Sequence, residues 1–229
     1  MNKIIRYKLS LFYNCLIVVL TILSTIIMFT GYKFMHGVEP VLETTKLGVF
    51  KYFTVDSNIF AGIISVLFIF INIRLLKGEM EYVSKRQYIL KLMATVGVFL
   101  TFSVVFLYLG PISKGGISSL LQNSNLFFHF VIPLLNVIDF IFFIKINDIK
   151  YRYAFYGFVP MLLYSCFYIT NVLLHIENGM VSTKYDWYWF VQNGLWTMVI
   201  VIPIIILLTY LLSLILIILN KRVFINTKG

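Results

Sequence analysis

Charged residues are scarce in this chain of 229 residues. They make up 12% of the sequence, against roughly 25% in ordinary soluble domains, whereas hydrophobic residues make up 60%. The mean hydropathy is +0.93. A water-soluble fold of this size could not bury so much apolar surface. The composition therefore excludes a soluble domain and predicts an integral membrane protein.

Cysteine is also scarce, and long polar linkers are absent. Cys15 and Cys166 both fall inside predicted helices, which excludes a disulfide framework. No internal repeat is visible, so residues 1–229 are expected to form a single domain. The first apolar segment follows three basic residues, as in a signal peptide. The segment is longer than the apolar region of a typical signal peptide and lacks an A-x-A cleavage site, so we predict that it stays in the protein as a permanent helix.

Six apolar windows have the length of about 20 residues that a helix needs to cross a bilayer. We predict spans at Leu9–Tyr32, Val49–Leu75, Tyr88–Leu109, Leu120–Ile144, Tyr153–His175 and Val191–Leu219. With six spans, 14 of the 19 basic residues lie on one side, counting Lys91 just inside the third helix. The sequence thus predicts an all-α six-transmembrane-helix bundle with both termini cytoplasmic. It also predicts contact with anionic lipid headgroups on that side, and no nucleic-acid partner, because the cations are spread over short loops.

The stretch KYFTVDSN at the start of the second span is unusually polar. At about 100° per residue, Thr54, Asn58, Ala61, Ser65 and Asn72 share one helix face. Small and hydroxyl residues mark helix contacts in membranes, so this face is expected to point into the bundle.

The fourth and fifth spans carry similar stripes. His129 and Asn136 share a face of the fourth span, with Asp139 about 80° away. In the fifth span, Tyr168 and His175 share a face with Tyr164 and Asn171. The stretch KYDWYWFVQNG before the sixth span adds further polar groups, including Gln192 and Asn193, although its aromatic residues are also typical of an interfacial belt. These stripes predict a polar pocket in the outer half of the bilayer.

A threonine and a histidine at similar depth suggest acyl-transfer chemistry. Neutral histidine is the usual base that removes a hydroxyl proton near pH 7, so His129 could activate Thr54. An oxyanion could be stabilised by Ser57, Asn58, Tyr168 or Asn171. Membrane lipids carry ester groups near this depth and are the expected substrate.

The runs KYFTVDSN and NLFFHFVIPLLNVID together resemble the androgen-induced-protein (FAR-17a-like) family of multi-pass membrane hydrolases. The chain is still more similar to a bacterial group of six-helix membrane proteins with F-T-x-x-S-N and H-x-x-x-P patterns. The resemblance spans most of the chain through these two short motifs. It implies that Thr54 is the nucleophile and His129 its base, and that the substrate is a fatty-acid ester of a hydroxy fatty acid. No cofactor is required by this mechanism. The supporting or substrate-binding residues are expected to be Asp56, Ser57, Asn58, Asn136, Tyr168, Asn171 and His175.

Other interpretations of these residues stay open at this point. Thr54 could bond a main-chain carbonyl one turn back or pack a helix interface. Asp56 could pair with Lys51 or orient His129 as a third member of a triad. Asp139 could pair with a polar or cationic neighbour, which we favour over a proton relay. No H-x-x-x-H or H-E-x-x-H spacing relates His36, His129 and His175, so we predict no metal site.

The main rival is a small transporter or lipid-binding protein without catalysis. A transport path needs polar groups that continue to the cytoplasmic side, and only Asn72 and Asp139 stand out in that half of the second and fourth spans. A catalytically inactive scaffold would tolerate loss of Thr54. The Lys-, Ile- and Asn-rich, Ala-poor composition favours a bacterial plasma membrane.

Overall fold

The computed structural model describes residues 2–35, 45–146, 148–177, 180–191 and 194–225. Within them, six helices are long and apolar enough to cross a membrane: Lys3–Thr30, Phe53–Leu76, Lys85–Ile112, Ser124–Phe143, Tyr151–Leu174 and Leu195–Phe224. The prediction of a six-span, all-α membrane protein is confirmed. His36, Gln192 and Asn193 lie outside the described residues.

The spans are built from shorter elements, because prolines and glycines interrupt several of them. The helices of more than one turn are α1 (Lys3–Thr30), α2 (Phe53–Leu76), α3 (Lys85–Val104), α5 (Gly116–Leu120), α7 (Ile132–Phe143), α8 (Ala154–Gly157), α9 (Val159–Leu174) and α10 (Leu195–Ile225). Short helical pieces are η1 (Lys46–Lys51), η2 (Val105–Leu109), α4 (Gly110–Ile112), α6 (Ser124–Leu126), η3 (Phe127–Val131) and η4 (Tyr151–Tyr153). The strands β1 (Ile176–Glu177) and β2 (Met180–Val181) pair antiparallel.

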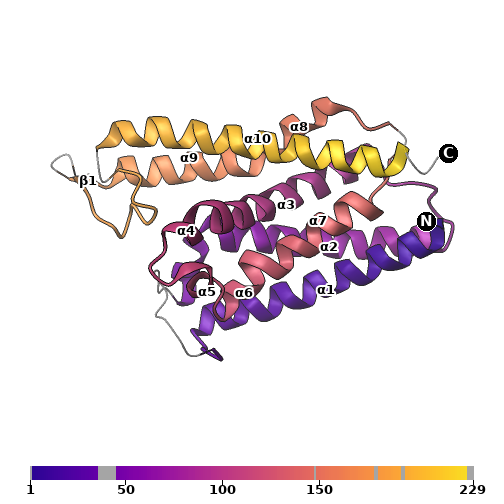
Figure 1. The fold of residues 1–229 in the computed structure, drawn as a ribbon, viewed down its shortest axis with the longest axis horizontal. Helices are drawn as coiled ribbons and strands as arrows, with labels where there is room; N and C mark the ends of the chain where they lie inside the picture. Colours follow the sequence, from indigo (N-terminus) through magenta and orange to yellow (C-terminus); the bar gives the residue numbers. More distant parts are fainter. Residues whose placement is uncertain (1, 36–44, 147, 178–179, 192–193, 226–229) are drawn as a thin grey trace.

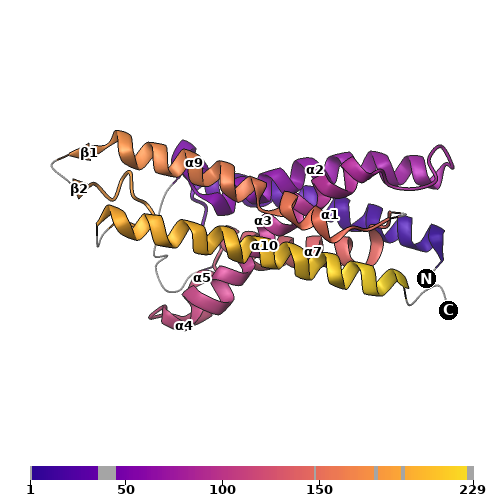
Figure 2. The same cartoon turned by 90° about the horizontal axis from the view of Figure 1, so that it is seen from above.

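The helix α3 occupies the centre of the bundle. It contacts α2 and α7 on one side and α8, α9 and α10 on the other, and α1 covers α2 and α7. Figures 1 and 2 show that the start of α1 and the end of α10 lie at the same end of the molecule, as an even number of spans requires. We call this the terminal end and the opposite one the loop end.

Within the described residues, two turns of π-helix interrupt the spans, and each ends two residues before a proline. In η3, the N–H of Ile132 donates to the carbonyl of Phe127, five residues back. Pro133 has no N–H with which to continue the α-helical ladder at this point, and the wider turn compensates. Such π-bulges occur frequently at functional sites. His129 lies within this one.

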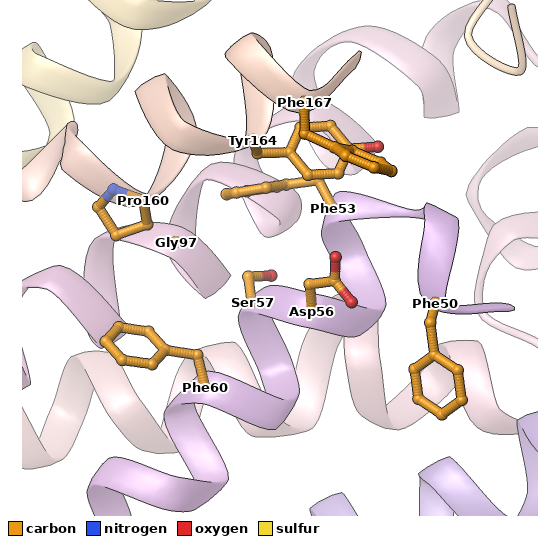
Figure 3. Close-up of a pocket in the computed structure, with 9 residues that line it drawn as sticks. All are labelled: Phe50, Phe53, Asp56, Ser57, Phe60, Gly97, Pro160, Tyr164 and Phe167. Atoms are coloured by element: carbon orange, nitrogen blue, oxygen red, sulfur yellow. The ribbon is translucent and has the colours of Figure 1, made fainter. Parts of the chain in front are cut away.

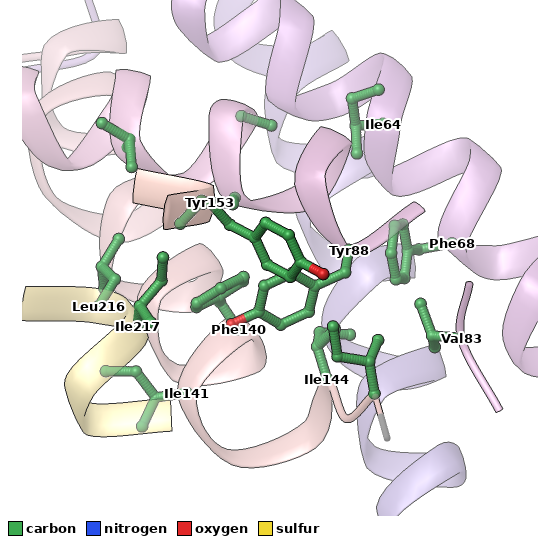
Figure 4. Close-up of a cluster of buried hydrophobic side chains, with 14 of the residues drawn as sticks. Ile64, Phe68, Val83, Tyr88, Phe140, Ile141, Ile144, Tyr153, Leu216 and Ile217 are labelled. Carbon is green, nitrogen blue, oxygen red and sulfur yellow. The ribbon is translucent and has the colours of Figure 1, made fainter. Parts of the chain in front are cut away.

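The main apolar core lies toward the terminal end. Figure 4 shows Tyr88, Phe140 and Tyr153 at its centre, and the rings of Tyr88 and Phe140 have centroids 5.1 Å apart. The amide of Asn220 donates to three main-chain carbonyls in the last turn of α7, and its oxygen accepts from the Tyr88 hydroxyl at 3.1 Å. The side chain of one helix thus caps the end of another.

Candidate functional site

Thr54 is the second residue of α2, and the start of this helix is held from outside. The N–H of Phe53 donates to the Tyr188 hydroxyl at 2.9 Å, and the Tyr164 hydroxyl donates to the Lys51 carbonyl at 2.6 Å. Both tyrosines come from the α9 side of the bundle. The first turn of α2 is therefore fixed by contacts from residues more than 100 positions away.

The Thr54 side chain is half-buried, and its hydroxyl has no hydrogen bond within the described residues. Several threonines in these spans behave differently: the hydroxyls of Thr25, Thr95 and Thr209 donate to the carbonyl four residues back. The hydroxyls of Thr21 and Thr197 are, like that of Thr54, without a hydrogen bond within the described residues. That back-bond is the usual structural role of a threonine in a membrane helix. In the described structure the Thr54 hydroxyl does not have this back-bond.

The imidazole of His129 is held in one tautomer. Its Nδ1 lies 2.7 Å from the carbonyl oxygen of Leu120, at the end of the short helix α5. Because a carbonyl oxygen can only accept, Nδ1 carries the hydrogen and Nε2 of the neutral ring is unprotonated. This is the state that a general base requires.

Asn58 connects the two candidate residues. Its Nδ2 donates to the carbonyl of Thr54 at 2.8 Å and to the carbonyl of Phe128, next to His129, at 3.1 Å. The side chain is fully buried. It fastens the first turn of α2 to the π-bulge beside His129. Both amide hydrogens are used, so Asn58 is a positioning residue and has no hydrogen left for an oxyanion.

Asp56 and Ser57 face helix α9 and not the π-bulge of His129. Together with Phe53, Tyr164 and other residues they line a pocket of about 440 Å³ that borders α9, and Figure 3 shows the Asp56 carboxylate directed toward Phe53. Asp56 lies two residues after Thr54, about 200° round the helix. The structure therefore does not bring Asp56 beside His129, and the Ser57 hydroxyl donates to the Thr54 carbonyl at 3.1 Å.

The predicted residues of α9 bind the loop before α10 instead. The Tyr168 hydroxyl donates to Asp186, whose carboxylate also accepts the N–H groups of Phe190 and Val191 at 2.9 and 3.1 Å. Asn171 donates to the carbonyl of Tyr185 at 2.8 Å. The buried Asp186 thus organises this loop, and α9 supplies its anchors.

Part of the same loop packs inward, while Trp189 is exposed. Trp187 is only 5% exposed, and its Nε1 donates to the Tyr164 hydroxyl at 3.0 Å. The His175 ring stacks on Tyr185 at 3.6 Å. Burial raises the pKa of the Tyr188 phenol well above its ordinary value and lowers the pKa of the Lys51 ammonium. The Nζ of Lys51 lies over the ring of Trp187, at 5.6 Å from its centroid.

A second polar cluster lies deep in the terminal half of the bundle. Lys91 and Asp139 form an ion pair at 2.8 Å, with both side chains fully buried. Asp139 also accepts from the Ser10 hydroxyl at 2.7 Å and from the Asn14 amide at 2.9 Å. Lys91 donates to the amide oxygens of Asn14 and Asn136 at 2.8 and 3.4 Å. Four helices, α1, α2, α3 and α7, contribute to this cluster, since Asn72 of α2 donates to Ser10.

This cluster corrects the expectation for Lys91 and explains Asp139. Lys91 does not face the cytoplasmic headgroups, because it is turned into the bundle toward Asp139. Asp139 pairs with a cation, as favoured from the sequence. Asn136 belongs to this cluster and not to the neighbourhood of Thr54. Ser10 and Asn14 are polar residues four positions apart in the first apolar segment, and this spacing indicates that α1 also contributes to the cluster.

A comparison of the chain with protein-family models, curated proteins and solved structures finds no match. The resemblance to the androgen-induced-protein family therefore stays a prediction that depends on the two motifs. Among the described residues, no group of three or more His, Cys, Asp or Glu side chains is placed to hold a metal ion.

Proposed function

We propose that this chain is an integral membrane hydrolase that cleaves a lipid ester, with Thr54 as nucleophile and His129 as base. The observation that carries the proposal is the Asn58 bridge, which joins the main chain at Thr54 to the main chain beside His129. The unengaged Thr54 hydroxyl and the His129 tautomer support it. A fatty-acid ester of a hydroxy fatty acid is the substrate that the family resemblance implies.

The reaction has two steps. In the first, Nε2 of His129 takes the Thr54 hydroxyl proton while the oxygen attacks the ester carbonyl, and the departing alcohol then takes that proton. In the second, Nε2 deprotonates a water that attacks the acyl-threonine, which releases the fatty acid and restores Thr54. The Leu120 carbonyl stabilises the imidazolium that forms in each step, since it accepts from Nδ1.

The proposed orientation places this site in the outer leaflet, with both termini in the cytoplasm. Thr54 begins α2 at the loop end of the bundle, and the spans carry mostly apolar residues on their exposed faces. An ester bond near the headgroup boundary would lie at this depth. The proposal of a bacterial plasma membrane is supported by the Lys-, Ile- and Asn-rich, Ala-poor composition alone.

The alternative function is transport or lipid binding without catalysis. The observation that favours it is the Lys91–Asp139 cluster, which extends buried polar groups into the terminal half. Each charged group there has its partners in place, and neither side chain is exposed. Such a sealed and satisfied pair is typical of a structural network, so we place hydrolysis first.

The test is hydrolysis of a fatty-acid ester of a hydroxy fatty acid by purified protein and four variants. Thr54→Val keeps the shape and removes the hydroxyl, and His129→Asn keeps a donor toward Leu120 and removes Nε2. We expect about 10²- to 10⁴-fold lower kcat/KM for His129→Asn and no detectable turnover for Thr54→Val. Thr54→Ser should retain part of the activity. Thr25→Val is the matched control, since Thr25 is also half-buried and its hydroxyl is internally bonded.

Equal turnover in Thr54→Val and the unmodified protein would contradict the proposal. Absence of turnover, together with Asp139-dependent proton uptake in proteoliposomes, would favour the transport alternative.

A further inference from the structure

A second pocket lies at the terminal end, far from Thr54 along the bundle. It has a volume of about 740 Å³ and is lined by the start of α1, the loop after α2 and the ends of α7 and α10. Its lining combines three cations, one carboxylate and several aromatic rings, among them Lys3, Arg6, Tyr7, Glu81, Phe143, Lys145 and Phe224. The pocket is thus positively charged overall and apolar on one side.

Arg6 is the unusual member of this lining. Its side chain is only 8% exposed, and the guanidinium lies 5.1 Å from the Tyr7 ring and 5.4 Å from the Phe224 ring. Its one hydrogen bond within the described residues is a long one, 3.4 Å from Nη2 to the Tyr7 hydroxyl. The Nε is buried and has no partner there.

An arginine carries five N–H donors, and leaving them unpaired in a buried position is costly. The two flanking rings compensate the charge in part but accept no N–H in the guanidinium plane. Nε is the buried donor that lacks a partner, and an oxygen bound in the pocket beside Arg6 would supply acceptors that the described chain does not. A group with several oxygens in fixed geometry satisfies this arrangement best.

The surroundings specify the charge of that group. Arg6 lies in the first turn of α1, where the helix dipole is positive and no acidic residue is present. The Nζ of Lys145 lies 5.3 Å from the Phe224 ring centroid, and Lys3 joins the same lining. A dianionic group is favoured over a neutral one by this potential.

We propose that this pocket binds a phosphate group, held by Arg6 and flanked by Lys3 and Lys145. Phe142, Phe143 and Val223 provide an apolar wall that suits a phosphate carried on an acyl glycerol, as in an anionic phospholipid. A soluble phosphate monoester shares the same recognition chemistry. The site is independent of the proposed hydrolysis, because none of its residues belongs to the Thr54 region.

The test measures binding to the full-length protein in detergent with two probes, short-chain phosphatidic acid and inorganic phosphate. For Arg6→Gln we expect binding of the preferred probe to weaken at least about tenfold, as for loss of charge-assisted bonds. Lys145→Gln should weaken it by a smaller factor. Lys8→Gln is the matched control, because Lys8 is exposed on the same helix and does not line the pocket. It should change binding less than about twofold.

Glu81→Gln gives a prediction of opposite sign. Its carboxylate lies in the same lining, so its neutralisation should tighten phosphate binding. Tighter binding of phosphatidic acid than of inorganic phosphate assigns the site to a lipid, and the reverse order assigns it to a soluble anion. Equal weakening by Arg6→Gln and Lys8→Gln, or no saturable binding of either probe to folded protein, would overturn the proposal.

Discussion

The structure gives the most detailed prediction for the loss of stability in the variant Asp139→Asn. The carboxylate accepts from Lys91 Nζ at 2.8 Å, Ser10 Oγ at 2.7 Å and Asn14 Nδ2 at 2.9 Å, and it is completely buried. Asparagine removes the charge and directs an amide N–H₂ toward groups that are themselves donors. Lys91 is then left as a buried cation without its counterion.

Removing one partner of a buried ion pair costs about 3–5 kcal/mol. For a protein of this size, that corresponds to a fall of about 6–20 °C in Tm. We expect this fall for Asp139→Asn and for Lys91→Met in thermal unfolding of the detergent-solubilised protein. The double variant Lys91→Met/Asp139→Leu removes both charges, so it should be more stable than either single variant.

The reasoning would be refuted by additive losses in the double variant, because additivity means that the two side chains do not interact. An unchanged Tm in Asp139→Asn would equally exclude a structural ion pair. In that case a transport role for the pair would gain weight.

Three further predictions concern packing, pH and the proposed site. Gly157→Ala should lower the free energy of unfolding by about 1–3 kcal/mol, since the added methyl would overlap Ser213 of α10, and Tm in detergent measures it. Burial raises the pKa of Tyr188, so its contribution to stability is present below about pH 10 and lost above it as the unfolded chain ionises. A pH series of Tm should therefore fall above pH 10, and fall less in Tyr188→Phe. Asn58→Asp removes the amide donors to the Thr54 carbonyl and to the Phe128 carbonyl beside His129, so ester hydrolysis should fall about tenfold or more while Asn58→Gln retains some activity.

The six spans could be predicted from sequence, because length and hydropathy alone decide which segments cross a bilayer. The inward face of α2 could also be predicted: Asn58, Ser65 and Asn72 are all buried, as the 3.6-residue period requires. Their burial depends on one regular helix with no proline. The period of 3.6 residues applies to such a regular α-helix.

The fourth span shows where the period fails. The sequence predicts one face for His129 and Asn136 but not their separate partners: His129 bonds to the Leu120 carbonyl and Asn136 joins the Lys91 cluster. His129 lies within the π-bulge before Pro133 and Asn136 lies in the α-helix after it, so the rotation per residue changes between them. A periodic pattern cannot register a local change of helix type.

The loop before α10 and the partner of Asp139 depend on tertiary packing. Trp187 and Tyr188 have the composition of an interfacial belt, but the buried Asp186 turns the loop back onto α9. Lys91 follows a cationic helix start, and only the packing of four helices shows that it faces inward. The sequence around Asp186 or Lys91 does not show which distant helix each residue contacts.

The central claim is that Thr54 is an activated nucleophile, and covalent labelling tests it most directly. Purified protein is treated with a fluorophosphonate probe, and the modified residue is located by peptide mass spectrometry, beside Thr54→Val, His129→Asn and the control Thr25→Val. The account predicts an adduct on Thr54 that is absent in Thr54→Val, at least about tenfold slower in His129→Asn, and unchanged in Thr25→Val. Absence of labelling at Thr54 in the folded, unmodified protein, or labelling at another residue that persists in Thr54→Val, would contradict it.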